Sequence, residues 1–165
     1  MNRITLNELL NTNKEEFFGK TICFITDTVW GIGAVIGKDF ITAKDKIYEM
    51  KNRDYSKPLA ILAPSIDEIK KHVKINDPKV QELMLKWPGA LTIVFEKSDE
   101  YFDEVTQLPT VGLRIPNSKV ALSILNYLGF MATTSVNISG SAPLNDKEEI
   151  VKYFEEYIDY LVVDE

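Results

Sequence analysis

The sequence predicts a single α/β domain, built as a twisted mixed sheet flanked by helices. Short β-rich apolar runs alternate with helical segments, which points to a layered α/β architecture. The 165-residue length suits one domain, and 45% hydrophobic with 27% charged residues is the balance of a soluble globular chain. Two strand-like runs follow each other near Leu91 and Thr110. A mixed sheet is therefore favoured over a purely parallel one.

Helix and strand signals fix the expected elements. Thr5 with Glu8, and Ser65 with Glu68, have the spacing of capping boxes, which begin helices. Short apolar runs with β-branched residues predict buried strands. In chain order we predict a helix over 5–18, a strand over 21–26, a helix over 42–51, a strand over 59–62, a short helix after 65, a helix over 78–86, strands over 91–95 and 110–115, a helix over 118–128, a strand over 131–136, a helix over 146–157 and a strand over 160–163.

Composition excludes several functional classes. The single cysteine, Cys23, cannot form an intrachain disulfide, and with one histidine, His72, it cannot make a Cys-rich zinc site. Cys23 lies in an apolar run and is predicted to be a core residue. His72 follows two lysines and is predicted to be a solvated surface residue. The sequence has neither a signal-peptide stretch nor a membrane-length apolar run, so we expect a soluble, cytoplasmic protein without a membrane partner.

The net charge of −6 is spread unevenly. Residues 145–165 contain eight acids and two bases, whereas residues 44–57 contain five bases and three acids. A general nucleic-acid binder usually carries a strong basic patch. The balance therefore argues against that class and leaves room for a local cationic pocket that holds phosphates.

Four segments place polar or cationic residues at the ends of apolar strands, where open α/β sheets hold ligands. In Thr26–Gly33, two hydroxyls flank an acid and two glycines follow, which fits either a ligand site or an ordinary strand turn. Lys51, Arg53 and Lys57 lie within seven residues. Such a cluster suits a polyphosphate, or else a solvated helix end.

The other two segments are equally open to two interpretations. Arg114 interrupts an apolar strand and needs a partner, which is either a structural carboxylate or a ligand carboxylate. Residues Thr133–Ser141 gather hydroxyls and an amide after a strand. They fit phosphate oxygens or the waters of a metal ion, or simply a turn or helix cap. No protein ligand to a metal is predicted.

Together these segments resemble the threonylcarbamoyl-AMP synthase family, the YrdC-like proteins. Five family motifs occur in order between about Thr21 and Pro143. They are Thr26-Asp27-Thr28-Val29-Trp30-Gly31-Ile32-Gly33; Lys51-x-Arg53 with Lys57-Pro58-Leu59; Trp87-Pro88-Gly89-Ala90-Leu91-Thr92; Thr110-Val111-Gly112-Leu113-Arg114-Ile115-Pro116; and Ser135-Val136-Asn137-Ile138-Ser139-Gly140. Five ordered matches are far more specific than any one of them.

The resemblance implies a concave nucleotide-binding groove and an enzyme. L-threonine, bicarbonate and ATP, with Mg²⁺, would give threonylcarbamoyl-AMP and pyrophosphate. A tRNA threonylcarbamoyl-transfer complex would then receive the product, with tRNA itself a further candidate contact. By resemblance the ATP-binding residues are Lys51, Arg53, Lys57, Thr110, Ser135 and Asn137, with Lys51 and Arg53 as catalytic cations. The implied threonine-binding residues are Thr26, Thr28, Arg114 and Thr133.

Three departures from the family pattern affect the expected site. Ile25 replaces a proline, and Trp30 replaces the usual tyrosine and is expected to narrow or reshape the pocket. In the family a further stretch follows, with an arginine near the nucleotide, whereas this sequence ends at Glu165. We therefore expect a short form whose nucleotide affinity depends on another chain completing the site.

Three other functions remain as alternatives. A non-catalytic RNA-binding module is disfavoured by the net charge of −6. A regulatory relative that binds nucleotide without turnover is supported by the short C-terminus and opposed by the retained phosphate-binding motifs. Another carbamoyl-transfer enzyme of the same fold is disfavoured by length, because such enzymes are usually long multidomain chains.

Overall fold

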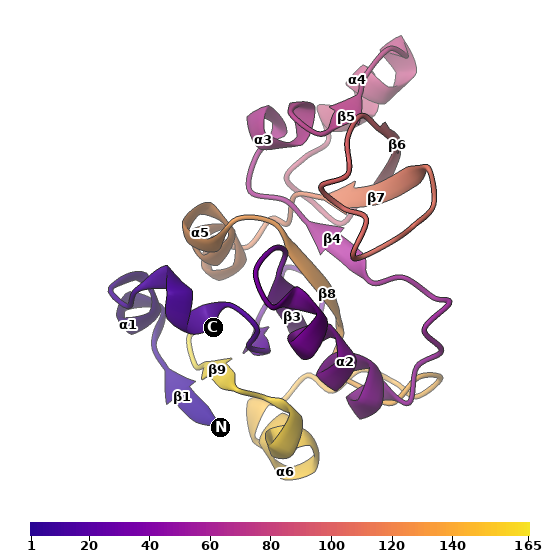
Figure 1. The fold of residues 1–165 in the computed structure, drawn as a ribbon. Coiled ribbons are helices and arrows are strands. Elements are labelled where there is room, and N and C mark those ends of the chain that lie inside the picture. Colours follow the sequence, from indigo (N-terminus) through magenta and orange to yellow (C-terminus); the bar gives the residue numbers. More distant parts are fainter.

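The computed structural model describes residues 1–165 and contains one nine-stranded sheet with six α-helices (Figure 1). The strands are β1 (Asn2–Ile4), β2 (Ile22–Phe24), β3 (Gly31–Val35), β4 (Ala60–Leu62), β5 (Val73–Lys74), β6 (Ile93–Lys97), β7 (Thr110–Arg114), β8 (Met131–Ser135) and β9 (Tyr160–Val162). The helices are α1 (Leu6–Leu10), α2 (Phe40–Lys51), α3 (Ile66–Lys70), α4 (Pro78–Met84), α5 (Lys119–Leu128) and α6 (Lys147–Phe154).

The strands run in the order β1-β9-β2-β3-β8-β4-β7-β6-β5. The pairs β1–β9, β9–β2 and β4–β7 are parallel, and the other neighbouring pairs are antiparallel. The predicted mixed sheet is therefore confirmed. Strands β1, β3 and β5 were not predicted, because β1 and β5 lack an apolar run and the two glycines of β3 indicated a turn or a ligand site.

Capping side chains begin most helices where the sequence predicts. Thr5 and Glu8 form a complete capping box at α1, and Ser65, Asp77, Ser118 and Asp146 each accept a backbone N–H in the first turn of α3, α4, α5 and α6. The helix predicted over 5–18 is wrong beyond Leu10. The Asn13 side chain instead accepts a hydrogen bond from the Glu15 N–H and begins a separate 3₁₀ helix, Lys14–Phe17.

Two hydrophobic cores lie on opposite faces of the sheet, because alternate residues of a strand point to opposite sides. Ile32 and Ala34 of β3 belong to the larger core of 31 buried residues, whereas Val35 belongs to the smaller core of 14. Helices α2 and α6 contribute to the larger core, and α1 and α5 pack side by side on the smaller one (Figure 1).

The face that α1 and α5 cover is left open over the other end of the sheet. In β6 and β7, Ile93 and Leu113 point into the larger core. The alternate residue Val94 is 61% exposed, and it is paired with Gly112. Helices α3 and α4 gather at the β5 end of the sheet (Figure 1). An uncovered strip of the sheet face therefore runs over β8, β4, β7 and β6.

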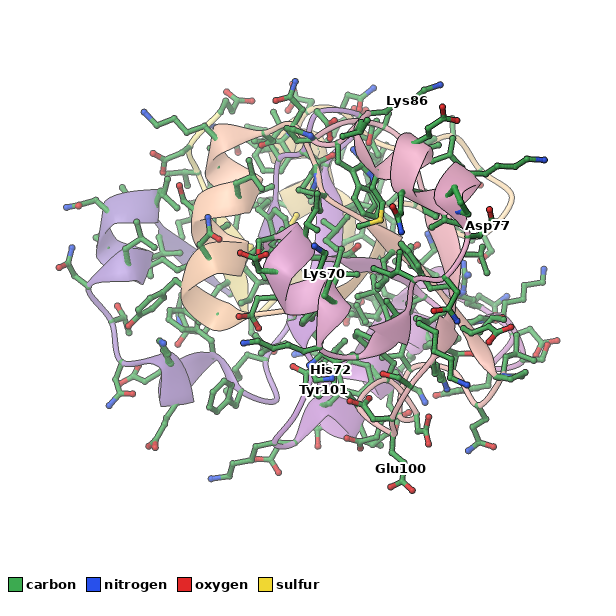
Figure 2. All side chains as sticks on the ribbon, turned by 90° about the horizontal axis from the view of Figure 1, so that it is seen from above. Lys70, His72, Asp77, Lys86, Glu100 and Tyr101 are labelled. Atoms are coloured by element: carbon green, nitrogen blue, oxygen red, sulfur yellow. The ribbon has the colours of Figure 1, made fainter.

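The structure confirms the sequence prediction for Cys23 and contradicts the one for His72. Cys23 is fully buried, and burial raises the pKa of its thiol well above the ordinary range, so the predicted core role is confirmed. The prediction of a solvated His72 is wrong. Its side chain is 19% exposed, its Nδ1 lies 2.7 Å from Asp99 Oδ2, and its ring stacks on Tyr101 with centroids 4.1 Å apart (Figure 2).

No helix in the structure has both the length and the apolar character needed to cross a bilayer.

An added methyl group should have a large effect at one of the two glycines of β3 and a small effect at the other. A Cβ on Gly33 would lie 2.5 Å from Thr133 Cγ2 and 3.0 Å from the Ala132 carbonyl, whereas a Cβ on Gly31 meets its nearest atom at 3.5 Å. We expect Gly33→Ala to lower the free energy of unfolding by about 1–3 kcal/mol, measured by urea denaturation. Gly31→Ala is the matched control and should change it by less than about 1 kcal/mol.

Thr133→Ser removes the clashing methyl, so the double variant Gly33→Ala/Thr133→Ser should recover much of the lost stability. Equal stability of Gly33→Ala and the wild type would contradict the close approach of β3 and β8.

Candidate functional site

Two adjoining cavities lie on the open strip of the sheet. The larger has a volume of about 470 Å³ and the smaller about 130 Å³. Five residues line both cavities, namely Ala60, Thr92, Thr133, Thr134 and Ser135. The cavities are therefore two parts of one hollow on the β8–β4 surface.

Strand register explains which side chains line the hollow. Ala60 pairs with Thr133, and Gly31 pairs with Ser135. Paired residues point to the same side of a sheet, so small side chains and hydroxyls gather together. Gly112, opposite Val94, also lines the larger cavity. Small residues at the floor leave space that larger side chains would fill.

Arg114, at the end of β7, is held at the smaller cavity by three segments. Its Nε donates to the Gly89 carbonyl at 3.0 Å, its Nη1 to Thr28 Oγ1 at 3.4 Å, and its Nη2 forms an ion pair with Asp27. Both charged side chains are 15% exposed. One partner of Arg114 is thus a structural carboxylate, that of Asp27.

The hydroxyls of Thr26 and Thr28 form a directed chain that ends at Arg114. Thr26 Oγ1 donates to the Val29 carbonyl at 2.7 Å and lies 3.2 Å from Thr28 Oγ1. Since the Thr26 proton is used on Val29, Thr28 is the donor of the hydroxyl pair. The Thr28 oxygen can then accept from Arg114, and both threonines line the smaller cavity.

Lys51, at the end of α2, lies beneath the larger cavity in a buried polar network. It is 3% exposed, and its Nζ donates to the Ser135 carbonyl at 2.8 Å and to Asn137 Oδ1 at 2.5 Å. Ser135 Oγ donates to the same Asn137 oxygen at 2.9 Å. No carboxylate balances the ammonium. Burial and then the nearby Arg53 charge lower the pKa of Lys51 from its ordinary 10.5 to about 8.

Arg53 lines the larger cavity, in the loop after α2. Its Nε donates to the Lys57 carbonyl at 3.1 Å and its Nη2 to the Pro58 carbonyl at 2.9 Å. The Tyr48 hydroxyl donates to the same Lys57 carbonyl. The Lys57 side chain is exposed and lines neither cavity. In this structure Lys57 therefore supports Arg53 through its backbone.

The site residues predicted from the sequence lie in four kinds of position relative to the two cavities. Five line the smaller cavity, namely Thr26, Thr28, Arg114, Thr133 and Ser135, and four line the larger, namely Arg53, Thr110, Thr133 and Ser135. Lys51 and Asn137 lie beneath Ser135, and the Lys57 side chain lies outside.

Sequence reasoning also missed some residues and misplaced others. It assigned no role to Asp27, Thr92 or Thr134, although Asp27 and Thr92 lie within the quoted motifs. Trp30, expected to narrow or reshape the pocket, lines neither cavity, because its side chain is 2% exposed and lies in the larger core.

The site offers no ready-made metal centre. No group of three or more His, Cys, Asp or Glu side chains is placed to hold an ion. No carboxylate lines either cavity, whereas several threonine and serine hydroxyls do. Mg²⁺ usually keeps several waters and binds through one or two carboxylates with substrate phosphates. These residues fit an ion that is held by a nucleotide and touches the protein through hydroxyls or water.

Comparison with known proteins identifies relatives of this chain. The sequence profile of the Sua5, YciO and YrdC family, described as "Telomere recombination", matches residues 18–165. A candidate threonylcarbamoyl-AMP synthase of Methanocaldococcus jannaschii is 34% identical over 90% of this chain and 70% of its own length. The threonylcarbamoyl-AMP synthase of Bacillus subtilis is 33% identical over 79% of this chain and 38% of its own.

Solved structures share the fold. The structure of Pyrococcus abyssi Sua5 with L-threonine superposes with a TM-score of 0.82 at 27% identity, over 98% of this chain and 48% of that one. Escherichia coli YciO, at 19% identity, gives a TM-score of 0.79 over 98% of this chain and 81% of that one, which shows the fold alone. The chain thus spans less than half the length of the Bacillus and Pyrococcus proteins. On these matches, and as its five ordered motifs indicate, the chain belongs to the Sua5, YciO and YrdC family.

Proposed function

We propose that this chain is a threonylcarbamoyl-AMP synthase, which joins L-threonine, bicarbonate and ATP and releases pyrophosphate. The observation that carries the proposal is the pair of adjoining cavities. One presents the oriented Arg114 guanidinium to a small ligand, and the other presents Arg53 beside hydroxyls. Relatives of the same family that are named threonylcarbamoyl-AMP synthases support this assignment.

The smaller cavity suits L-threonine. Its volume of about 130 Å³ is well below the roughly 300 Å³ at which drug-sized pockets begin. In our proposal Arg114 binds the threonine carboxylate, and the hydroxyls of Thr26, Thr28 and Thr133 surround the rest of the amino acid. The threonine complex of the Pyrococcus relative, at 27% identity, agrees with a threonine site in this fold.

The larger cavity suits the triphosphate. Arg53 and the Thr110 and Ser135 hydroxyls line it. The buried Lys51 ammonium, 2.8 Å from the Ser135 carbonyl, adds positive charge directly under the lining. Asn137 holds both Lys51 and Ser135 in place. Mg²⁺ would enter with ATP and neutralise phosphate charge there.

The proposed reaction asks the protein for alignment more than for a base. The threonine amine and bicarbonate first form N-carboxythreonine with loss of water. Its carbamate oxygen then attacks the α-phosphorus, the bond from that phosphorus to the bridging oxygen breaks, and pyrophosphate leaves. Two anions must approach each other, so positioning and charge neutralisation lower the barrier. In our proposal Arg114 positions the threonine part in one cavity. Arg53 and Lys51 position the triphosphate in the other.

Threonylcarbamoyl-AMP is a reactive mixed anhydride, so a further enzyme must use it soon after it forms. We propose that a tRNA threonylcarbamoyl-transfer complex receives it in the cytoplasm, as a step in tRNA modification. The experiment that tests the assignment measures pyrophosphate release from ATP with Mg²⁺ and bicarbonate, with and without L-threonine. Threonine-dependent release is expected. ATP binding without such release would instead support a nucleotide-binding regulatory relative.

Arg53 and Lys57 give a matched pair of variants in one loop. Arg53→Ala removes a cation that lines the larger cavity, whereas Lys57→Ala removes an exposed cation that lines neither cavity. Since hydrogen bonds to charged groups contribute about 1.5–3 kcal/mol, Arg53→Ala should weaken ATP binding about 10- to 100-fold, measured by calorimetry. Lys57→Ala should change it less than about threefold. Equal losses in both variants would show that Lys57 also binds the nucleotide.

The lowered pKa of Lys51, about 8, predicts that ATP affinity falls as the pH rises. Above pH 8 the amine must take up a proton to be charged, so the affinity should fall by up to about tenfold per pH unit. Lys51→Arg stays charged and should give a flatter profile over pH 7–9.5. A flat wild-type profile would contradict a charged Lys51 in binding.

Loss of folded protein at high pH through the titration of Lys51 would not explain a fall in ATP affinity. Between pH 8 and 10.5 the unfolded chain holds the Lys51 proton more tightly than the folded chain does. The contribution of Lys51 to stability therefore rises with pH in that window. Thermal unfolding at each pH checks this sign.

A further inference from the structure

We infer that Asp27 is a positioning residue, which orients the Arg114 guanidinium toward the carboxylate of an amino acid in the smaller cavity. This inference rests on the proposed function and deepens it. Asp27 pairs with Arg114 Nη2, yet it does not line either cavity. It therefore acts on a ligand only through Arg114.

Two of the N–H groups of the Arg114 guanidinium have no hydrogen-bond partner in the protein. Arginine has five N–H donors in a fixed planar fork. One donates to the Gly89 carbonyl, one to Thr28 and one to Asp27. The remaining two, one on each terminal nitrogen, have no protein partner. Because Arg114 lines the smaller cavity, these are the donors that a carboxylate in the cavity would meet.

Asp27 is the one charged group among the three partners of Arg114. A cation that is 15% exposed has lost much of its hydration, and the carboxylate compensates for that loss. Gly89 and Thr28 offer neutral acceptors, and the Thr28 bond is long at 3.4 Å. Removing the charge of Asp27 should therefore loosen the whole guanidinium, so that the end facing the cavity moves and the Nε bond to the Gly89 carbonyl opens more often.

A competing role for Asp27 predicts the opposite sign. If Asp27 occupied the carboxylate-binding edge of Arg114, an incoming threonine would have to displace it, and weakening the pair would tighten threonine binding. The position of Asp27 outside the cavity lining argues against displacement. The two roles are therefore separated by the direction in which the threonine KM moves.

The test compares Asp27→Asn, Asp27→Glu and Glu148→Gln. Asp27→Asn keeps the shape and removes the charge. We expect it to raise the threonine KM at least about tenfold, with kcat and the ATP KM changed less than about twofold. Asp27→Glu restores the charge and should recover part of the loss. Glu148→Gln breaks the Arg3–Glu148 pair, at the opposite end of the sheet, and should change no kinetic constant.

A second readout does not depend on activity. The Nε–H signal of Arg114 in a ¹H–¹⁵N spectrum is identified by its absence in Arg114→Lys. In Asp27→Asn we expect this signal to shift and its N–H to exchange with water at least about tenfold faster, while thermal unfolding confirms that the variant is folded. Glu148→Gln should leave the signal unchanged.

The two readouts separate failure of the inference from failure of the proposed function. Wild-type protein without threonine-dependent pyrophosphate release would refute the proposed function, and the Arg114 signal would still decide whether Asp27 orients the guanidinium. An unchanged threonine KM, or a lower one, in folded Asp27→Asn would overturn the inference. So would an unchanged Arg114 signal.

Discussion

The site depends on the alternation of side chains along β8, β4, β7 and β6. Ile61, Ile93 and Leu113, from β4, β6 and β7, point into the larger core. The alternate positions must then face the other side of the sheet. Helix α5 covers that side only where Leu62 and Met131 join the smaller core, and small or polar residues such as Ala60, Gly112 and Thr133 line the uncovered part. A shift of one residue in any pairing would bury the site and expose the core.

The distribution of charge keeps acids away from this hollow. The chain carries a net charge of −6, and residues 145–165 account for all of it, with eight acids and two bases. That segment includes α6 and β9, at the opposite end of the molecule from β6 and β7 (Figure 1). No carboxylate lines either cavity. An acidic protein thus retains a locally cationic site, which a count of charges over the whole chain does not reveal.

Local features could be predicted from the sequence, and non-local pairings could not. The caps at Thr5 and Ser65 follow from residues three positions apart, so they were predicted. Arg114 stood out because a charge in an apolar strand needs a partner, but Asp27 lies 87 residues away in the chain. Nothing local identifies such a pair. Likewise, the pairing of Gly33 with Thr133 gives this glycine its role in packing, where the sequence favoured a turn or a ligand contact.

Lys51 and Arg114, the two largely buried cations of the site, are stabilised in different ways. The difference matches the ligands that we propose for the two cavities. Arg114 has a permanent counter-ion, so its surroundings are close to neutral and suit a zwitterionic amino acid. Lys51 has only neutral acceptors, the Ser135 carbonyl and Asn137, and its charge is uncompensated. An uncompensated buried cation costs free energy until an anion arrives nearby. A polyphosphate above Ser135 would lower that cost. Polyphosphate binding would thus be favoured because it relieves the unfavourable free energy of the buried Lys51 charge in the folded chain.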